Sequence, residues 1–319
     1  MTAIEINGLS KDYLTGFWRK KPRRVLDGLT LSVETGEVFG FLGHNGAGKT
    51  TTLKILTSLI APTEGTARIL GSPIGTPETF NQVGYLPENP YFYDYLTPDE
   101  LLDYFGRFFH MTASQRHERR ETVLEQVGLK EFRGTALRKF SKGMLQRIGI
   151  AQAVLHDPQI VLLDEPMSGL DPVGRRDVRN LILHLKQQGK TIFFSTHILS
   201  DAEALCDRVA ILGGGKLVGV GRIADLLRRE SGYEAIVECD EPETKRKLEA
   251  LASMPAVSSG GHFRLEVGED RVMELHAICA AGRARLISLN PLRFSLEDYF
   301  VGLLDRSTPA AVDRTGPHS

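Results

Sequence analysis

The sequence contains few cysteines and no excess of charge of either sign. Only three of the 319 residues are cysteine, and Cys206, Cys239 and Cys279 lack the spacing of a metal-binding or redox motif. This pattern favours a reducing, cytosolic compartment. Lysine and arginine total 39 and aspartate and glutamate total 40, which leaves a net charge of -1. Because no basic field covers the whole chain, nucleic acid is not expected as a partner.

Long apolar runs and a leader segment are also missing. No window approaches the roughly 20 apolar residues that a membrane-spanning helix requires. Residues 1–6 lack the basic and apolar regions of a signal peptide. If the protein acts at a membrane, we therefore expect another chain to span it. Hydrophobic residues make up 41% and charged residues 25% of the sequence, which is typical of a globular protein, and the length favours about two domains.

A glycine-rich loop follows the first strongly apolar strand. Residues 37–42 form a β-branched and aromatic run, and residues 50–59 carry leucines at helical spacing. Between them lies a match to G-x-x-x-x-G-K-[ST], a loop whose backbone N–H groups bind phosphate at the start of a helix. We expect Lys49 to reach the β- and γ-phosphates and Thr50 to give its hydroxyl to Mg²⁺. The predicted nucleotide-binding residues are Gly43, His44, Asn45, Gly46, Ala47, Gly48, Lys49, Thr50 and Thr51.

Two acids end a second apolar strand, which we predict over residues 159–164. Because this strand reads as buried on both faces of a parallel sheet, Asp164 and Glu165 are expected at its carboxyl edge, where the glycine loop also lies. Asp164 suits the magnesium site, and Glu165 suits polarising a water for attack on the γ-phosphate. The alternative interpretation is that both acids only cap the turn at Pro166.

The order of the elements predicts an α/β fold of the P-loop NTPase class. Residues from about 99 to 155 read as mostly helical, including a charged helix at 115–126, whereas residues 61–65 read as a turn. The predicted strands lie at 3–6, 25–33, 37–42, 159–164, 191–195, 208–212 and 216–221. The predicted domains are an ATP-binding domain at 1–221 with a helical subdomain at about 88–156, a small α+β accessory domain at 222–306, and a disordered tail at 307–319.

The accessory domain is predicted from a second set of short elements. Its strands are expected near residues 233–238, 263–266 and 285–290, and its helices near residues 243–252 and 269–280.

Several further motifs stand in the order found in one family, and over residues 3–220 the chain resembles the ATP-binding subunit of an ABC transporter. Phe140-Ser141-Lys142-Gly143-Met144 resembles the signature usually written Leu-Ser-Gly-Gly-Gln. Residues 168–171 resemble the D-loop. Tyr13 resembles the aromatic side chain that stacks on adenine, and His197 resembles the switch histidine that contacts the γ-phosphate.

The resemblance implies an ATPase that uses ATP and Mg²⁺ and acts as a head-to-tail homodimer. Ser141, which also fits the N-cap of the helix it precedes, and Gly143 would then contact the nucleotide held by the other copy. A membrane-spanning permease subunit would be the partner, with this chain peripheral on the cytoplasmic side of the cell membrane. Residues 294–300 resemble the C-terminal stretch of exporter-type members. The alternatives are a soluble ABC-type or other P-loop ATPase not coupled to transport, and a module that binds ATP without turnover.

The chain departs from the family pattern at three positions. Glu88 stands where the family carries a glutamine, and as a carboxylate it would accept a hydrogen bond from a Mg²⁺-bound water, which makes it a third candidate near the metal. Lys142 and Met144 replace a glycine and a glutamine of the signature. These changes concern the half-site offered to the other copy and leave the glycine loop intact.

Two surface segments carry clustered aromatic or basic residues. Four aromatics, Tyr91, Phe92, Tyr93 and Tyr95, follow Glu88, and they predict either a docking groove for a helix of the membrane subunit or rings packed inside the helical subdomain. Residues 17–24 form a basic loop that would either touch anionic lipid or form a solvated hairpin tip.

Overall fold

The computed structural model describes residues 1–16, 20–227, 232–259, 262–281, 284–292 and 295–297. The chain divides into two compact units, Met1–Ile223 and a second unit that begins at Ala224. The tail predicted at 307–319 lies outside the described residues. None of the helices in the described ranges is long and apolar enough to cross a bilayer.

A six-stranded sheet forms the centre of the first unit. Its order is β10-β9-β3-β8-β7-β6, and every pairing is parallel except that of β9 with β10. Every residue of β3, β7 and β8 is buried, as expected for central strands of a parallel sheet. The strands are β3 (Val38–Leu42), β6 (Val83–Leu86), β7 (Ile160–Asp164), β8 (Thr191–Thr196), β9 (Arg208–Gly213) and β10 (Lys216–Arg222).

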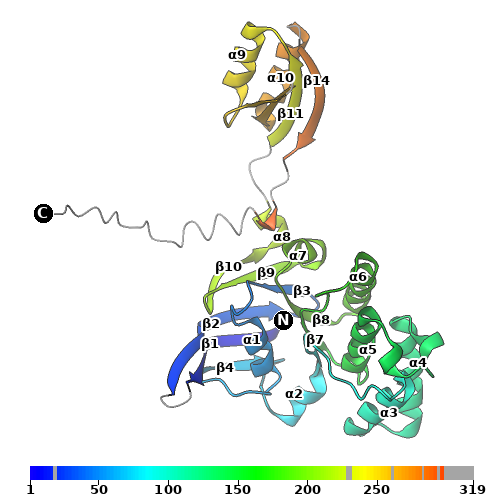
Figure 1. Ribbon diagram of the computed structural model, residues 1–319. Helices are drawn as coiled ribbons and strands as arrows, with labels where there is room; N and C mark the ends of the chain where they lie inside the picture. The colour runs from blue at the N-terminus through cyan, green and yellow to red at the C-terminus, as the bar shows by residue number, and fades with distance from the viewer. Residues whose placement is uncertain (17–19, 228–231, 260–261, 282–283, 293–294, 298–319) are drawn as a thin grey trace, which may run out of the picture. The chain divides into compact units, whose positions relative to one another are not determined.

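Helices follow the parallel strands, and the strand–loop–helix unit predicted around the glycine loop is confirmed. Figure 1 shows α1 next to the central sheet. These helices are α1 (Lys49–Leu56) after β3, α6 (Pro172–Gln187) after β7 and α7 (Leu199–Leu205) after β8, whereas α8 (Ile223–Leu226) follows the antiparallel β10. Because the loop ends at Lys49, the amino end of α1 points at whatever the loop binds.

A four-stranded antiparallel sheet of order β2-β1-β4-β5 completes the unit. Its strands are β1 (Thr2–Thr15), β2 (Lys21–Glu34), β4 (Glu64–Ile69) and β5 (Ser72–Pro73). The turn predicted at 61–65 is wrong for its last two residues, because β4 begins at Glu64 and pairs with β1. The loop predicted at 17–24 is also too long, because β2 begins at Lys21; residues 17–19 lie outside the described part. Pairing with β1 decided both cases, across the local β1–β2 hairpin for β2 and over a long distance in the sequence for β4, and turn-forming residues could not reveal it.

The region predicted as helical contains α3 (Pro98–Phe108), α4 (Ala113–Gln126) and α5 (Lys142–Val154), which Figure 1 shows gathered to one side of the sheet, and α2 (Pro77–Gln82) precedes β6. Capping boxes start α3 and α4, where Thr97 pairs with Glu100 and Thr112 with Gln115. Short 3₁₀ turns at Lys130–Phe132 and Leu137–Lys139 join α4 to α5. The predicted N-cap is confirmed, because Ser141 Oγ accepts a hydrogen bond from Met144 N at 3.3 Å.

His156, which follows the end of α5, contacts both β6 and the end of α3. Its ring stacks on Phe109 with the centroids 3.7 Å apart, and its Nε2 lies 3.2 Å from the carbonyl oxygen of Val83. Burial lowers the pKa of His156 from 6.5 to about 4, so the ring is neutral in the folded protein at neutral pH. The unfolded chain therefore binds a proton more readily than the folded one between these two values.

We expect the free energy of unfolding to fall by up to about 3 kcal/mol as the pH drops from 6.5 toward 4, because protonation of His156 favours the unfolded state. Denaturant titrations at several pH values measure this. His156→Gln should flatten the dependence in that window, whereas the same change at exposed His117 should not. An unaltered pH profile in the His156 variant would contradict this assignment.

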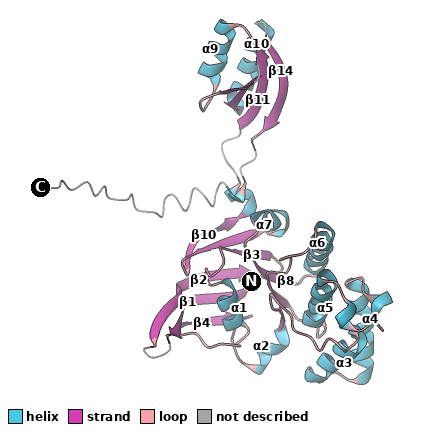
Figure 2. Ribbon diagram, in the orientation of Figure 1, coloured by secondary structure: helices cyan, strands magenta, loops and turns pink. Residues whose placement is uncertain are grey.

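The second unit has the order β-α-β-β-α-β and a four-stranded antiparallel sheet, β12-β13-β11-β14, which is the ferredoxin-like arrangement. The three predicted strands and both predicted helices are found close to the predicted positions, whereas β12 was not predicted. Ala235, Val237 and Leu265 of the sheet pack with Leu248 and Leu275 of the helices, so both helices cover one face (Figure 2). The elements are β11 (Gly232–Cys239), α9 (Pro242–Leu251), β12 (Val257–Ser259), β13 (His262–Gly268), α10 (Val272–Ala281), which follows the 3₁₀ turn Glu269–Arg271, and β14 (Ala284–Pro291).

Candidate functional site

The glycine loop connects the carboxyl end of β3 to α1. Gly46 and Gly48 have φ angles of 85° and 111°, a region that side chains with a Cβ rarely adopt. A Cβ on Gly48 would also lie 2.6 Å from Leu26 Cδ2, so the loop is packed against β2. The backbone path therefore favours glycine at positions 46 and 48, independently of the ligand that the motif suits.

Lys49 is buried beneath this loop with its ammonium group fully engaged. Its Nζ donates to the carbonyl oxygen of Gly43 at 2.7 Å and lies 3.1 Å from Glu165 Oε1. The side chains of Lys49 and Glu165 are only 6% and 7% exposed. Burial of two opposite charges in contact is costly unless they stay paired, so each fixes the other's position.

Asp164 lies at the end of β7, opposite Ser195 in the register of β7 with β8. Its Oδ1 accepts hydrogen bonds from Ser195 Oγ at 2.6 Å and from Thr50 Oγ1 at 3.2 Å. Burial raises the pKa of Asp164, and the two hydroxyl donors oppose that shift. Its Oδ2 is buried without a hydrogen-bond partner among the described residues. This oxygen is thus available to a ligand at the same edge as the glycine loop.

Glu165 adopts a backbone conformation that is unusual for its residue type. Its φ is 49°, in the left-handed region, which costs about 1–3 kcal/mol for a residue with a Cβ. Its N–H donates to Ser195 Oγ at 3.0 Å, and its Oε2 lies 2.9 Å from His197 Nδ1. Strain of this kind persists where the surroundings hold a residue for function. Lys49, Glu165 and His197 consequently form one continuous chain of polar contacts.

Ser195 belongs to the site, although the sequence did not identify it as a site residue. It is fully buried, donates to Asp164 and accepts from the N–H of Glu165, and so it orients both acids. The available signal was a hydroxyl at the end of the apolar strand 191–195. That signal is weak, because serine and threonine often end strands.

Replacing Ser195 by alanine is expected to lower the free energy of unfolding by about 2 kcal/mol, because a buried carboxylate loses a donor. ATP turnover should fall as well, since Asp164 and Glu165 both lose an orienting contact. Chemical denaturation and steady-state kinetics measure the two effects, with Ser114→Ala on the exposed face of α4 as the control. Full stability and full turnover in the Ser195 variant would remove it from the site.

Tyr85 and Glu88 extend the site from β6. Burial, followed by the negative charges of Asp164 and Glu88, raises the pKa of Tyr85, whose hydroxyl is buried without a partner in the described part of the chain. Glu88 itself is exposed. The negative charges of Asp164 and Glu88 thus both add to the effect of burial on the pKa of Tyr85.

The remaining predicted residues lie elsewhere. Within the described part of the chain, no hydrogen bond joins Ser141 or Gly143 to the glycine loop, and a Cβ on Gly143 would instead lie 3.9 Å from Gly174 Cα at the start of α6. Asp171, in the predicted D-loop, caps α6 through the N–H of Gly174 at 2.8 Å. Tyr13 lies in β1, 36% exposed, with Lys11 Nζ 5.5 Å from its ring centroid. The signature helix start is thus separate from the Lys49 site of the same chain.

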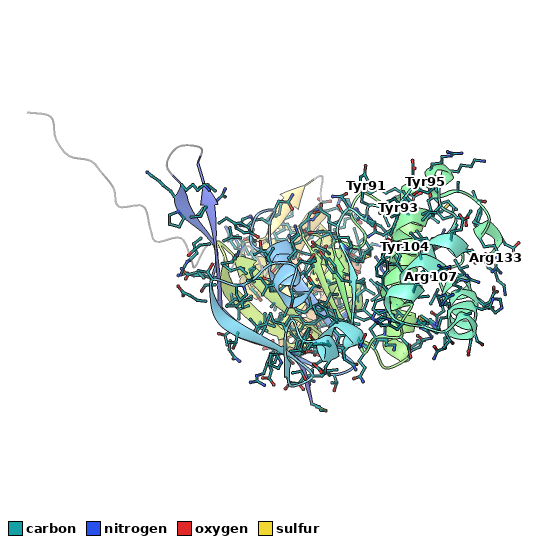
Figure 3. All side chains as sticks on the ribbon, turned by 90° about the horizontal axis from the view of Figure 1, so that it is seen from below. Tyr91, Tyr93, Tyr95, Tyr104, Arg107 and Arg133 are labelled. Carbon is teal, nitrogen blue, oxygen red and sulfur yellow. The ribbon has the colours of Figure 1, made fainter. Side chains whose placement is uncertain are left out.

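A group of exposed tyrosines covers part of the helical region. Tyr91, Tyr93 and Tyr95 are 101%, 55% and 63% exposed, so packing inside the subdomain, one of the two predicted alternatives, is wrong for these three rings. Phe92 is half-buried. Tyr93 contacts Tyr104 of α3, with centroids 6.2 Å apart. Figure 3 shows these tyrosines along one side of the helices.

The fold and the site define a P-loop nucleotide hydrolase. The "ABC transporter" family model matches residues 26–168. An uncharacterized ABC transporter ATP-binding protein of Synechocystis is 48% identical over 300 residues, covering 93% of this chain and 83% of that protein. The linearmycin resistance ATP-binding protein LnrL of Bacillus subtilis is 31% identical over 295 residues, covering 89% and 95%.

A solved structure of an ATP-binding subunit of an ABC transporter is 32% identical, with a TM-score of 0.61, and the match covers 70% of this chain and 91% of that one. The chain belongs to the family of ABC transporter ATP-binding proteins. It is the ATP-hydrolysing subunit of such a transporter, as the motifs of the glycine loop and the two strand-end acids predict.

Proposed function

We propose that two copies of this chain bind MgATP head to tail, hydrolyse it, and drive a membrane-spanning subunit that exports its substrate. The observation that carries this proposal is the chain of contacts from the buried Lys49 through the buried Glu165 to the more exposed His197. Lys49 supplies a cation that can bind phosphate, and Glu165 supplies a carboxylate that can accept a proton from water. His197 places an imidazole beside that carboxylate. The alternative, a soluble ATPase not coupled to transport, uses the same site.

Magnesium fits the residues at the edge of the sheet. Asp164 Oδ2 is a buried oxygen without a partner in the described structure, and the Thr50 hydroxyl lies beside the same carboxylate. No group of three or more His, Cys, Asp or Glu side chains forms a metal cage in the described ranges. Mg²⁺ prefers one or two protein oxygens together with waters and phosphates, which suits this set. When bound, it neutralises charge on the phosphates. Glu88 stays a proposed partner of a metal-bound water.

Lys49, Glu165 and His197 have different roles in the proposed hydrolysis of ATP. Lys49 exchanges its contact with Glu165 for the γ-phosphate, so Glu165 is released when the nucleotide binds. The Glu165 carboxylate then accepts the proton of the attacking water as the oxygen bonds to phosphorus and the bond to the β-phosphate oxygen breaks. His197 contacts Glu165, and its imidazole, which can donate or accept near neutral pH, would sense the γ-phosphate.

A second copy supplies what the Lys49 site lacks. The start of α5, with Ser141 and Gly143, offers backbone N–H groups and the positive end of a 13-residue helix, but it lies away from the glycine loop of its own chain. A head-to-tail pair brings each helix start to the other copy's nucleotide. Tyr13, half-exposed near the tip of the β1–β2 hairpin, is the proposed adenine contact.

The similarity to ABC transporter ATP-binding proteins supports the proposals that the transporter exports its substrate and that this chain lies at the cytoplasmic side of the membrane. A relative named for linearmycin resistance supports outward movement of a substrate. The exporter-like stretch 294–300 falls largely outside the described residues. The exposed tyrosines near α3 are the proposed docking surface for the membrane-spanning subunit.

The dependence of ATPase activity on protein concentration tests the proposed dimer. If both sites need two copies, the specific activity of the purified chain should rise with its concentration and then level off, because the dimer alone turns over. Addition of the membrane-spanning subunit in lipid should raise the activity at low concentration. A specific activity independent of concentration, and unaffected by the membrane subunit, would favour the soluble monomeric ATPase instead.

A further inference from the structure

Tyr85 lies in β6, on the same face of the central sheet as Asp164. β6 pairs in parallel with β7, and the register puts Tyr85 opposite Leu162. Side chains two residues apart in a strand lie on one face, so Leu162 and Asp164 share theirs. Tyr85 packs against the core cluster that contains Leu162 and Leu53 of α1. Asp164 contacts Thr50 at the start of the same helix. Both side chains therefore lie on the face of the sheet that α1 covers.

Two buried polar atoms on this face have no hydrogen-bond partner in the described part of the chain, Tyr85 Oη and Asp164 Oδ2. The other carboxylate oxygen of Asp164 is occupied, since its two donors are Ser195 Oγ and Thr50 Oγ1. Buried polar groups without partners destabilise a fold, and native proteins keep few of them. Two such atoms on one face, beside the glycine loop, point to a shared ligand.

The hydroxyl of Tyr85 is within reach of the position that Asp164 serves. Asp164 stands two residues beyond Leu162, so it is the diagonal neighbour of Tyr85. Diagonal neighbours on adjacent strands are about 7–8 Å apart, a distance that an aromatic side chain can span. Burial, followed by the negative charge of Asp164, raises the pKa of Tyr85, in agreement with this proximity. The neutral phenol keeps an oxygen that can accept a hydrogen bond.

We propose that Tyr85 is a positioning residue for magnesium, and that its hydroxyl oxygen and Asp164 Oδ2 accept hydrogen bonds from the same water of the hydrated ion. The inference rests on the proposed function, which puts magnesium beside Asp164 and Thr50. Mg²⁺ gives up its waters reluctantly and keeps several of them in protein sites. A water bound to the ion has two hydrogens to donate, and the two unpartnered oxygens accept one each.

Other occupants of this position fit less well or predict a different behaviour. A phosphate oxygen of the nucleotide has no hydrogen to donate, and the carboxylate of Asp164 would repel its negative charge. A structural water that stays in place without nucleotide would instead contribute to the stability of the chain by itself. Removal of the Tyr85 hydroxyl therefore has a different effect for each of these occupants.

Titration of Tyr85→Phe with ATP, once with Mg²⁺ and once with EDTA, tests the proposal, because this change removes only the hydroxyl. With Mg²⁺ we expect affinity to fall about 3- to 10-fold, the effect of one lost hydrogen bond. With EDTA the affinity should equal that of the unmodified chain. Electron paramagnetic resonance of Mn²⁺ added to the ATP-bound protein should show metal affinity lowered by the same factor. Denaturant unfolding without nucleotide should show no loss of stability, since the hydroxyl has no partner in the described part of the chain.

The control is Tyr104→Phe, which removes a hydroxyl from an exposed tyrosine of α3 and should change none of these values. An unchanged affinity of Tyr85→Phe for ATP with Mg²⁺ would overturn the proposal. An equal loss of affinity with EDTA would also overturn it, because the hydroxyl would then act on the phosphates. So would a loss of stability without nucleotide, because the hydroxyl would then hold the fold. If the unmodified chain binds ATP equally well with Mg²⁺ and with EDTA, the magnesium site of the proposed function is refuted, and the role of Tyr85 with it.

Discussion

Replacing Glu165 by glutamine should reduce ATP turnover by roughly 10²-fold or more while ATP still binds. Glutamine keeps the size of the side chain and its contact with His197, but it cannot accept a proton from the attacking water. The pairing of Lys49 with Glu165 adds a second consequence. Because the variant lacks the carboxylate that competes with phosphate for Lys49, its affinity for ATP should be equal to or higher than that of the unmodified chain.

The measurement combines turnover at saturating ATP with binding of a fluorescent ATP analogue and sedimentation of the bound species. We expect the variant to accumulate as a dimer with ATP, since the nucleotide that joins the two copies is no longer consumed. Glu125→Gln, at the end of α4 and away from the site, serves as the matched control. Hydrolysis at the unmodified rate would exclude Glu165 as the base.

Replacing Lys49 by alanine should weaken ATP binding by about 10-fold or more, because a charge-assisted contact with phosphate is worth about 1.5–3 kcal/mol. The change also leaves Glu165 buried without its cation, so we expect the nucleotide-free protein to be less stable. Calorimetric titration with ATP and thermal unfolding measure the two effects separately.

Lys54→Ala provides the control, since Lys54 lies on the exposed side of the same helix. An unchanged affinity for ATP in the Lys49 variant would show that the glycine loop does not hold the phosphates. The two variants together distinguish binding from chemistry: Glu165→Gln should lower turnover without weakening ATP binding, and Lys49→Ala should weaken binding itself.

The sequence alone predicted the parts of the site that depend on local order. A glycine loop between a strand and a helix needs residues 43–50 at fixed spacing, and an apolar strand that ends in Asp164 and Glu165 must present them at the sheet edge. The helical region and, apart from the short β12, the strands and helices of the second unit were also predicted, because helical and alternating apolar patterns are local signals.

Tertiary structure decided what depends on partners distant in the chain. Ser195 became a site residue only because β8 pairs with β7 and puts it opposite Asp164. Residues 64 and 65 became part of β4 because β1 lies beside them. Likewise, the ion pairs of Asp103 in α3 depend on Arg116 and Arg120 of α4, which the packing of the two helices brings beside it. Register, burial and ion pairing are properties of packed segments, and spacing within one segment does not contain them.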